Sequence, residues 1–127
     1  MNTKKILVVD DDPLTCELIS KILEINGFTT AIVTEHKEVL KTAKNEQPDL
    51  MLIDYHLGTA HGLEILQLLK AQTWGEDMPV IITSGIDRKN VALNAGADAF
   101  LLKPFDWAEL VSAVNALLQV AQQVTKN

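Results

Sequence analysis

Short apolar runs alternate with segments of helical periodicity along this chain. The first run, at positions 6–9, reads Ile-Leu-Val-Val and is bounded by charged residues, and four similar runs follow it. Such runs are typical of strands buried on both faces of a parallel sheet. The predicted strands cover residues 4–9, 28–33, 49–53, 80–84 and 99–102.

Helical segments separate these strands. Pro13 suits the first turn of a helix, and the apolar side chains that follow it recur at helical spacing. We expect that helix to bury Leu14, Leu18, Ile22 and Ile25. Further helices are predicted over residues 35–45, from 62 to before 75, over 88–95, and from about 106 onward, the last with Leu110, Val114, Leu117 and Ala121 inward. Five strand–helix units predict an α/β fold, a doubly wound five-stranded parallel sheet flanked by helices.

Composition and charge narrow the class of protein. The 127 residues suit one domain, with 47% hydrophobic and 22% charged residues. A net charge of -6 argues against direct binding to nucleic acid or to an anionic membrane surface. Cys16 is the only cysteine, so it cannot form an intrachain disulfide and is expected to be a buried filler. With no signal peptide or membrane span in the sequence, we expect a cytoplasmic protein.

Charged side chains follow three of the predicted strands. Asp10 and Asp11 come after the first strand, Asp54 after the third, and Lys103 after the fifth. The carboxyl ends of parallel strands share one edge of the sheet, where open α/β sheets bind ligands. Clustered carboxylates repel one another unless a cation joins them, and their oxygens suit a hard divalent ion such as Mg²⁺. Asp12 is instead expected to cap the first helix.

These residues form a pattern that resembles a known family. The segments that carry it are Val8-Val9-Asp10-Asp11-Asp12-Pro13, Leu52-Ile53-Asp54, Gly96-Ala97-Asp98-Ala99-Phe100 and Lys103-Pro104-Phe105. In this order they resemble the receiver domain of two-component response regulators, similar to the chemotaxis regulator. The resemblance covers residues 1–127 as a single receiver domain. It implies a flavodoxin-like fold with strand order 2-1-3-4-5 and five flanking helices.

The resemblance also implies a role for each site residue. Asp54 would accept a phosphoryl group from a sensor histidine kinase or a histidine phosphotransfer protein. Asp11 would bind Mg²⁺ directly, Asp10 would act through water or orientation, and the backbone carbonyl of His56 would be a further metal ligand. Lys103 would balance a phosphoryl oxygen, which agrees with the need of phosphoryl transfer for positioning and charge neutralisation.

The resemblance implies a switch as well. A hydroxyl at the end of the fourth strand would contact the phosphoryl group, and counting from Pro79 favours Ser84 over Thr83. Phe100 would turn inward with it, although plain core packing is an equal interpretation of that aromatic. The fourth helix, fifth strand and fifth helix would form the output face for an effector protein or a fused output domain. A phosphorylation-dependent dimer is a further expectation, and the domain would not be an enzyme beyond its own phosphorylation and dephosphorylation.

The loop after the third strand departs from the family pattern. Gly58 and His61 stand where the family usually has proline and aspartate. Glycine predicts a more flexible loop, so the sequence does not determine how long a phosphoryl group would stay on Asp54. His56 and Ile86 occupy positions that modulate hydrolysis in the family, with a solvated loop histidine as the alternative for His56. We disfavour His56 and His61 as a transition-metal pair because a hard-ion site is already present.

Other classes of protein fit less well. A haloacid-dehalogenase-like phosphatase would use Asp10 as nucleophile and Asp12 as acid/base, but that family wants threonine or valine where this chain has Leu14. A flavodoxin-like cofactor binder needs a phosphate loop after the first strand, and none is found there. A pseudo-receiver, acting only as an interaction module, should lack the acceptor or a metal carboxylate, and this chain lacks neither.

Overall fold

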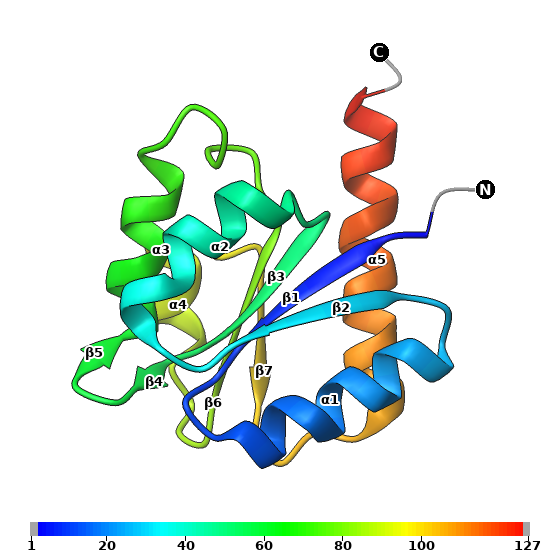
Figure 1. Cartoon of the computed structure of the whole chain (residues 1–127), viewed down its shortest axis with the longest axis horizontal. Coiled ribbons are helices and arrows are strands. Elements are labelled where there is room, and N and C mark those ends of the chain that lie inside the picture. Colours follow the sequence, from blue (N-terminus) through cyan, green and yellow to red (C-terminus); the bar gives the residue numbers. More distant parts are fainter. Residues whose placement is uncertain (1–2, 126–127) are drawn as a thin grey trace.

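A five-stranded parallel sheet with helices on each side forms this structure, a computed structural model that describes residues 3–125 and side chains up to residue 119. Figure 1 shows the elements in chain order. They are β1 (Lys5–Val9), α1 (Pro13–Ile25), β2 (Thr29–Val33), the 3₁₀ helix η1 (His36–Glu38), α2 (Val39–Glu46), β3 (Leu50–Asp54), β4 (His56–Leu57), β5 (Ala60–His61), α3 (Gly62–Lys70), β6 (Val80–Ser84), α4 (Lys89–Asn94), β7 (Ala99–Leu102) and α5 (Trp107–Thr125).

The strand order of the large sheet is β2-β1-β3-β6-β7. This confirms the predicted order 2-1-3-4-5, because β4 and β5 form a separate two-stranded sheet and β6 and β7 are the fourth and fifth strands. Val9 of β1 pairs with Ile53 of β3, and Asp54 pairs with Thr83 of β6. The register therefore brings the carboxyl ends of the three central strands to one edge.

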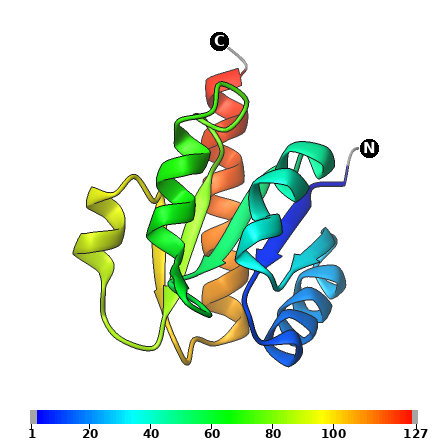
Figure 2. The same cartoon turned by 60° about the vertical axis from the view of Figure 1, so that its left-hand side comes forward.

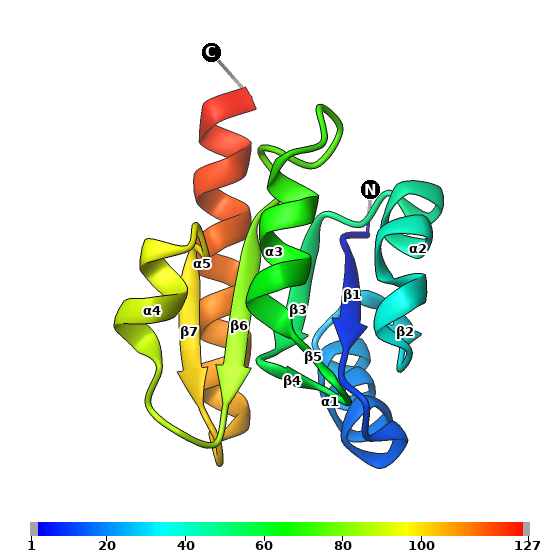
Figure 3. The same cartoon turned by 90° about the vertical axis from the view of Figure 1, so that its left-hand side faces the viewer.

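Helices cover the two faces of the sheet as separate layers. Helices α1 and α5 lie on one face, and α2, α3 and α4 lie on the other (Figures 2 and 3). Strand alternation supplies each layer with its own core. On β1, Ile6 and Val8 pack with the α1 and α5 residues Leu23 and Leu110, whereas Leu7 joins the core of the opposite layer.

The buried face of α1 differs from the predicted one. Leu14, Leu18 and Ile25 are exposed, with 74% of Leu14 and 80% of Ile25 accessible to solvent, so that prediction was wrong for three of its four residues. The buried side chains are Cys16, Ile19, Ser20, Ile22 and Leu23. This helix carries apolar residues on two faces, and periodicity alone does not decide which one docks. Cys16 is fully buried, as predicted.

The other helices follow the predicted pattern more closely. In α5, Leu110 and Val114 are fully buried and Leu117 packs against them, while the side chain of Ala121 lies outside the described residues. The Lys103–Pro104 peptide bond is cis. Within residues 3–125, none of the helices combines the length and the apolar character needed to cross a membrane.

Candidate functional site

Three carboxylates meet at the carboxyl edge of the sheet. Asp10 follows β1, Asp54 ends β3, and Asp11 lies beside them, so that one oxygen of each carboxylate lies within 4.8 Å of the others. Asp10 and Asp54 are only 3% and 8% exposed, whereas Asp11 is exposed to solvent. Three convergent carboxylates, one of them open to water, are a donor set that fits a hard divalent cation.

Lys103 provides the positive charge of this cluster. Its Nζ lies 3.0 Å from Asp10 Oδ2 and 3.4 Å from Asp54 Oδ1. Burial opposes the charged form of Lys103, but the hydrogen bond to Asp10 and the charges of Asp10 and Asp54 outweigh it and raise the lysine pKa. Burial also raises the pKa of Asp54, and the nearby Asp10 charge adds to this effect. Three ionised carboxylates against one ammonium leave two negative charges, which a divalent cation would neutralise.

Asp10 is held by backbone and side-chain contacts. Its Oδ1 accepts a hydrogen bond from the Asp12 N–H at 3.0 Å. Asp12 itself caps α1, as its position before Pro13 predicted: it accepts from the Leu14 N–H at 3.2 Å and from the Thr15 hydroxyl at 2.7 Å. The Thr15 hydroxyl lowers the pKa of Asp12. Asp12 thus belongs to the helix terminus and not to the acidic cluster.

Cys16 contacts the same end of β1, at the backbone of Asp10. Its thiol donates to the backbone carbonyl of Asp10, with Sγ and O 3.3 Å apart. Burial first, and then the Asp10 charge, raise the pKa of Cys16 to about 11. A thiol that stays protonated is a poor nucleophile, so its contribution is to packing.

The two candidate hydroxyls of β6 are buried. Ser84 Oγ accepts a hydrogen bond from the Ile86 N–H at 3.1 Å, and the Ser84 carbonyl accepts from the Lys103 N–H at 2.8 Å. The Thr83 carbonyl accepts from the Tyr55 N–H at 2.8 Å. Ser84 is therefore joined to Lys103, the residue just after β7, and Thr83 to the residue after Asp54. Among the described residues, neither hydroxyl donates a hydrogen bond to Asp54.

The segment after Asp54, which was predicted to be a loop, forms a hairpin. Strands β4 and β5 pair through a two-residue turn in which Gly58 has a φ of 63°. A glycine of positive φ in a two-residue connection is a hairpin signal, and it could have been recognised in the sequence. The Gly58 N–H donates to Asp11 Oδ2 at 3.0 Å, so the turn rests on the acidic cluster.

Gly62 begins α3 directly against the acidic cluster. Its N–H donates to the Tyr55 carbonyl at 2.6 Å. A Cβ atom at this position would overlap the backbone carbonyl of Asp54. Glycine is therefore required by the close approach of α3 to the end of β3.

Comparison with known proteins decides the family. The model of the response regulator receiver domain matches residues 6–115. The chain belongs to this family. Its sequence is 34% identical over 119 residues to the DNA-binding response regulator MtrA of Mycolicibacterium smegmatis, covering 91% of this chain and 51% of that protein. It is also 34% identical over 122 residues to the transcriptional regulatory protein PrrA of Mycobacterium tuberculosis, covering 94% and 52%. The receiver domain thus spans about half the length of these relatives.

Solved structures of receiver domains have the same fold. A CheY-like response regulator receiver domain protein from Methanospirillum hungatei superposes with a TM-score of 0.87 at 31% identity, covering 96% of this chain and 98% of that one. The receiver domain of a Francisella response regulator gives a TM-score of 0.87 at 33% identity, covering 94% and 99%. The chain is therefore a receiver domain of the two-component response regulator family. Such a domain acts in signalling.

A contact between Tyr55 and Arg88 in this receiver domain was not predicted from the sequence. The Arg88 Cζ lies 4.3 Å from the centroid of the Tyr55 ring, and Arg88 donates to the Tyr55 hydroxyl at 3.4 Å. Arg88 is the first residue of the helix predicted over residues 88–95, which belongs to the expected output face, yet its side chain packs on the residue next to Asp54. A cation–π contact between residues 33 positions apart leaves no signal in one sequence. Phe100, the candidate switch aromatic, is half-buried and packs against the core of the α2, α3 and α4 layer.

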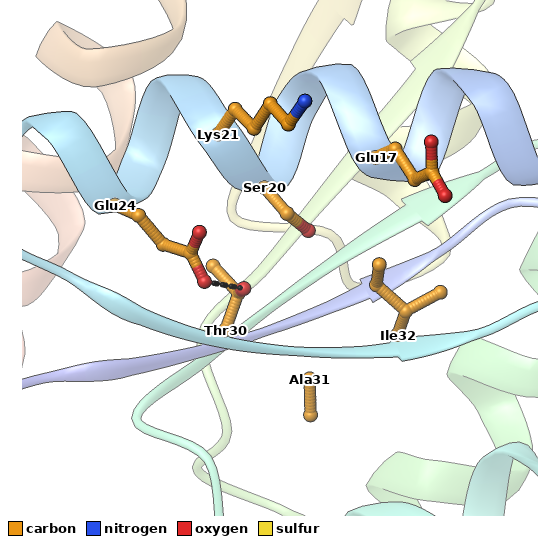
Figure 4. A pocket seen from close by; sticks show the side chains of 7 residues that line it. All are labelled: Glu17, Ser20, Lys21, Glu24, Thr30, Ala31 and Ile32. Atoms are coloured by element: carbon orange, nitrogen blue, oxygen red, sulfur yellow. Dashed lines mark hydrogen bonds between the residues drawn. The ribbon is translucent and has the colours of Figure 1, made fainter.

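A recess of the receiver domain lies between α1 and β2, away from the acidic cluster. Figure 4 shows Ser20 pointing into it and the Thr30 hydroxyl donating to Glu24 at 3.0 Å. None of the side chains that line it belongs to the acidic cluster: they are Glu17, Ser20, Lys21, Glu24, Thr30, Ala31 and Ile32. This recess therefore takes no part in the chemistry of the carboxyl edge.

Proposed function

We propose that Asp54 is the phosphoacceptor of this receiver domain. The observation that supports it is the position of the Asp54 carboxylate, which is nearly buried, 3.4 Å from the Lys103 ammonium and within 4.8 Å of two further carboxylates. One Asp54 oxygen attacks the phosphorus of a phosphohistidine on a sensor kinase or a phosphotransfer protein. The phosphorus–nitrogen bond breaks, and its electron pair returns to the imidazole of the donor.

The same proposal includes a divalent cation, Mg²⁺. Asp10, Asp11, Asp54 and the backbone carbonyl of His56 would hold it. Bound there, Mg²⁺ supplies the two positive charges that the cluster lacks and draws negative charge from the phosphoryl oxygens. Asp11 is the carboxylate open to solvent, so it is the first ligand an arriving cation meets.

Lys103 and Ser84 are proposed to contact the phosphoryl group once it is on Asp54. Lys103 exchanges part of its interaction with the carboxylates for a phosphoryl oxygen. The Ser84 hydroxyl accepts from the Ile86 N–H, which leaves its own hydrogen to donate to a phosphoryl oxygen. The two bonds together would couple the phosphoryl group to the segment before α4, with Phe100 turning inward as the second part of the switch. His56 and Ile86 are proposed to set the phosphoryl lifetime.

The output surface of this proposal is formed by α4, β7 and α5. Exposed apolar side chains lie on each of these elements: Val91, Leu93, Leu102 and Trp107. They offer contact area to an effector protein, to an output domain within a longer chain, or to a second receiver in a phosphorylation-dependent dimer. The matched relatives are about twice as long, and MtrA is named as DNA-binding. We propose that residues 1–127 act as a single receiver domain, and its cytoplasmic location remains a prediction from the sequence.

Mass spectrometry of the intact protein tests the acceptor. Wild type, Asp54→Asn and, as a matched control, Asp77→Asn are incubated with acetyl phosphate, with and without Mg²⁺. We expect a Mg²⁺-dependent phosphoryl adduct that hydroxylamine removes in wild type and in the control, and no adduct in Asp54→Asn. An adduct that persists in Asp54→Asn would refute the assignment, and its mapping to Asp10 would favour the phosphatase alternative.

A further inference from the structure

We propose that His56 and His61 form a binding site for a borderline divalent metal ion of the Zn²⁺ class, separate from the carboxylate cluster. The sequence disfavoured this pair because a hard-ion site was already present, but the hairpin, which was not predicted, reverses that interpretation by bringing the two histidines together. His56 and His61 are direct partners in the antiparallel pairing of β4 and β5. Side chains directly opposite in such a pair project from the same face. Each of the two residues is exposed, so an ion can reach them from solvent.

The two rings lie close to the separation of imidazoles that share one ion. Their centroids are 6.2 Å apart and their planes are inclined by 64°. With Zn–N bonds of about 2.1 Å and a tetrahedral angle, two imidazoles on one ion have centroids about 5.3 Å apart. The rings must therefore approach each other by about 1 Å, which rotation of two exposed side chains on one face of the hairpin allows without a change in backbone register.

The hairpin is held in place from several directions. The Tyr55 ring packs against both imidazoles, at 4.9 Å from the His56 centroid and 5.4 Å from the His61 centroid. Arg88 stacks on the same tyrosine at 4.3 Å. At the turn, the Gly58 N–H donates to Asp11 at 3.0 Å. Two ligands on a supported hairpin lose less freedom on binding than two ligands on a mobile loop.

Ligand chemistry separates this site from the acidic one. Imidazole nitrogens suit Zn²⁺, Cu²⁺ and Ni²⁺, whereas carboxylate oxygens suit Mg²⁺. Saturating Mg²⁺ should therefore occupy the carboxylates and leave the two histidines free. Two protein ligands leave the remaining coordination positions to water. Metal binding at the imidazoles is independent of whether Asp54 accepts a phosphoryl group.

Titration calorimetry with Zn²⁺ in the presence of saturating Mg²⁺ tests the site. We expect one ion per chain in wild type and binding at least about tenfold weaker, or 1.4 kcal/mol, in His56→Asn and in His61→Asn. The remaining histidine, His36, lies in η1. His36→Asn is therefore the matched control and should bind Zn²⁺ as wild type does. Asparagine is also a favoured N-cap residue, so His61→Asn keeps the start of α3.

Spectroscopy of the Cu²⁺-loaded protein provides the second readout. Electron paramagnetic resonance should show two coupled nitrogens in wild type, and one in each of the two hairpin variants. Three results would each overturn the site. These are Zn²⁺ binding unchanged in both hairpin variants, Zn²⁺ binding abolished by Asp54→Asn, and half an ion per chain, which would mean a site shared between two copies.

Discussion

Replacing Asp54 by asparagine should stabilise the metal-free receiver domain. Asp54 is attracted to Lys103 Nζ at 3.4 Å, which corresponds to about 5 kcal/mol at an effective dielectric constant of about 20. Asp10 presents an oxygen within 4.8 Å and repels Asp54 by about 3.5 kcal/mol or more on the same scale, whereas solvent screens the charge of the exposed Asp11. Attraction to Lys103 and repulsion by Asp10 therefore largely offset each other, and burial, the largest cause of the raised Asp54 pKa, makes the charged carboxylate unfavourable. We expect a net gain of about 1–2 kcal/mol when this charge is removed.

The pH dependence of this gain follows from the raised pKa of Asp54. Burial, and then the Asp10 charge, raise it above its ordinary value of 3.8, so the folded state binds the Asp54 proton more tightly than the unfolded state does. The ionised carboxylate therefore reduces stability at every pH above its folded pKa. Below 3.8 the group is protonated in both states and the cost disappears. The advantage of Asp54→Asn should be largest at neutral pH and shrink as the solution is acidified.

Urea unfolding followed by circular dichroism measures the effect, first in a chelator and then in Mg²⁺. Asp77→Asn, at an exposed position, is the matched control for the removal of one carboxylate. A bound cation stabilises the folded state by about 2.7 kcal/mol at 100 times its dissociation constant. Mg²⁺ should stabilise wild type more than Asp54→Asn. The difference in unfolding free energy between the two proteins should therefore become smaller in Mg²⁺, or change sign. A variant no more stable than wild type in the chelator, or a difference that Mg²⁺ leaves unchanged, would refute the reasoning.

Three further substitutions test the supporting residues. Lys103→Ala should lower the free energy of unfolding in a chelator by about 1–2 kcal/mol, less than a fully buried pair would lose because the lysine side chain is 29% exposed. Calorimetry should show that the Lys103→Ala variant still binds Mg²⁺. Loss of Mg²⁺ binding in this variant would contradict the proposal that Lys103 contacts the phosphoryl group and not the metal. Gly62→Ala should cost about 1–3 kcal/mol in thermal unfolding because its Cβ would overlap the Asp54 carbonyl, whereas Gly85→Ala, which has open space, should cost little. Cys16 should resist thiol reagents until the protein unfolds. The stability of wild type should fall relative to Cys16→Ala as the pH rises from 9.0 toward 11, since only the unfolded thiol ionises in that range.

The strands and the charged cluster could be predicted from the sequence because each depends on a local pattern. A buried parallel strand needs an uninterrupted apolar run, and a polar residue after it must lie at the sheet edge. Asp10, Asp54 and Lys103 each follow such a run, so their convergence required only the correct strand order. The helix cap at Asp12 is local in the same sense, since its partners lie two and three residues away.

The parts that the sequence did not predict depend on contacts between distant elements. The apolar residues of α1 fall on two faces, and only docking on the sheet buries Ile19 and Leu23 while leaving Leu14 in solvent. The contact of Arg88 with Tyr55 joins two loops that no periodicity relates. The β4–β5 hairpin is the exception, because its glycine turn was visible in the sequence but was interpreted as a source of flexibility.

Backbone hydrogen bonds hold the proposed acceptor in place on each side. The residue after Asp54 donates to Thr83 on one neighbouring strand, and its carbonyl accepts from Gly62 at the start of α3. The Lys103 N–H in turn donates to Ser84. Because these bonds do not depend on the charge of the side chains, Asp54→Asn and Lys103→Ala should change the electrostatics of the pocket and leave its geometry intact. Gly62→Ala should do the reverse, since it moves α3 against the acceptor without removing a charge. Phosphoryl transfer depends on positioning as well as on charge, so comparing the phosphorylation rates of Lys103→Ala and Gly62→Ala, which both keep Asp54, separates the two contributions.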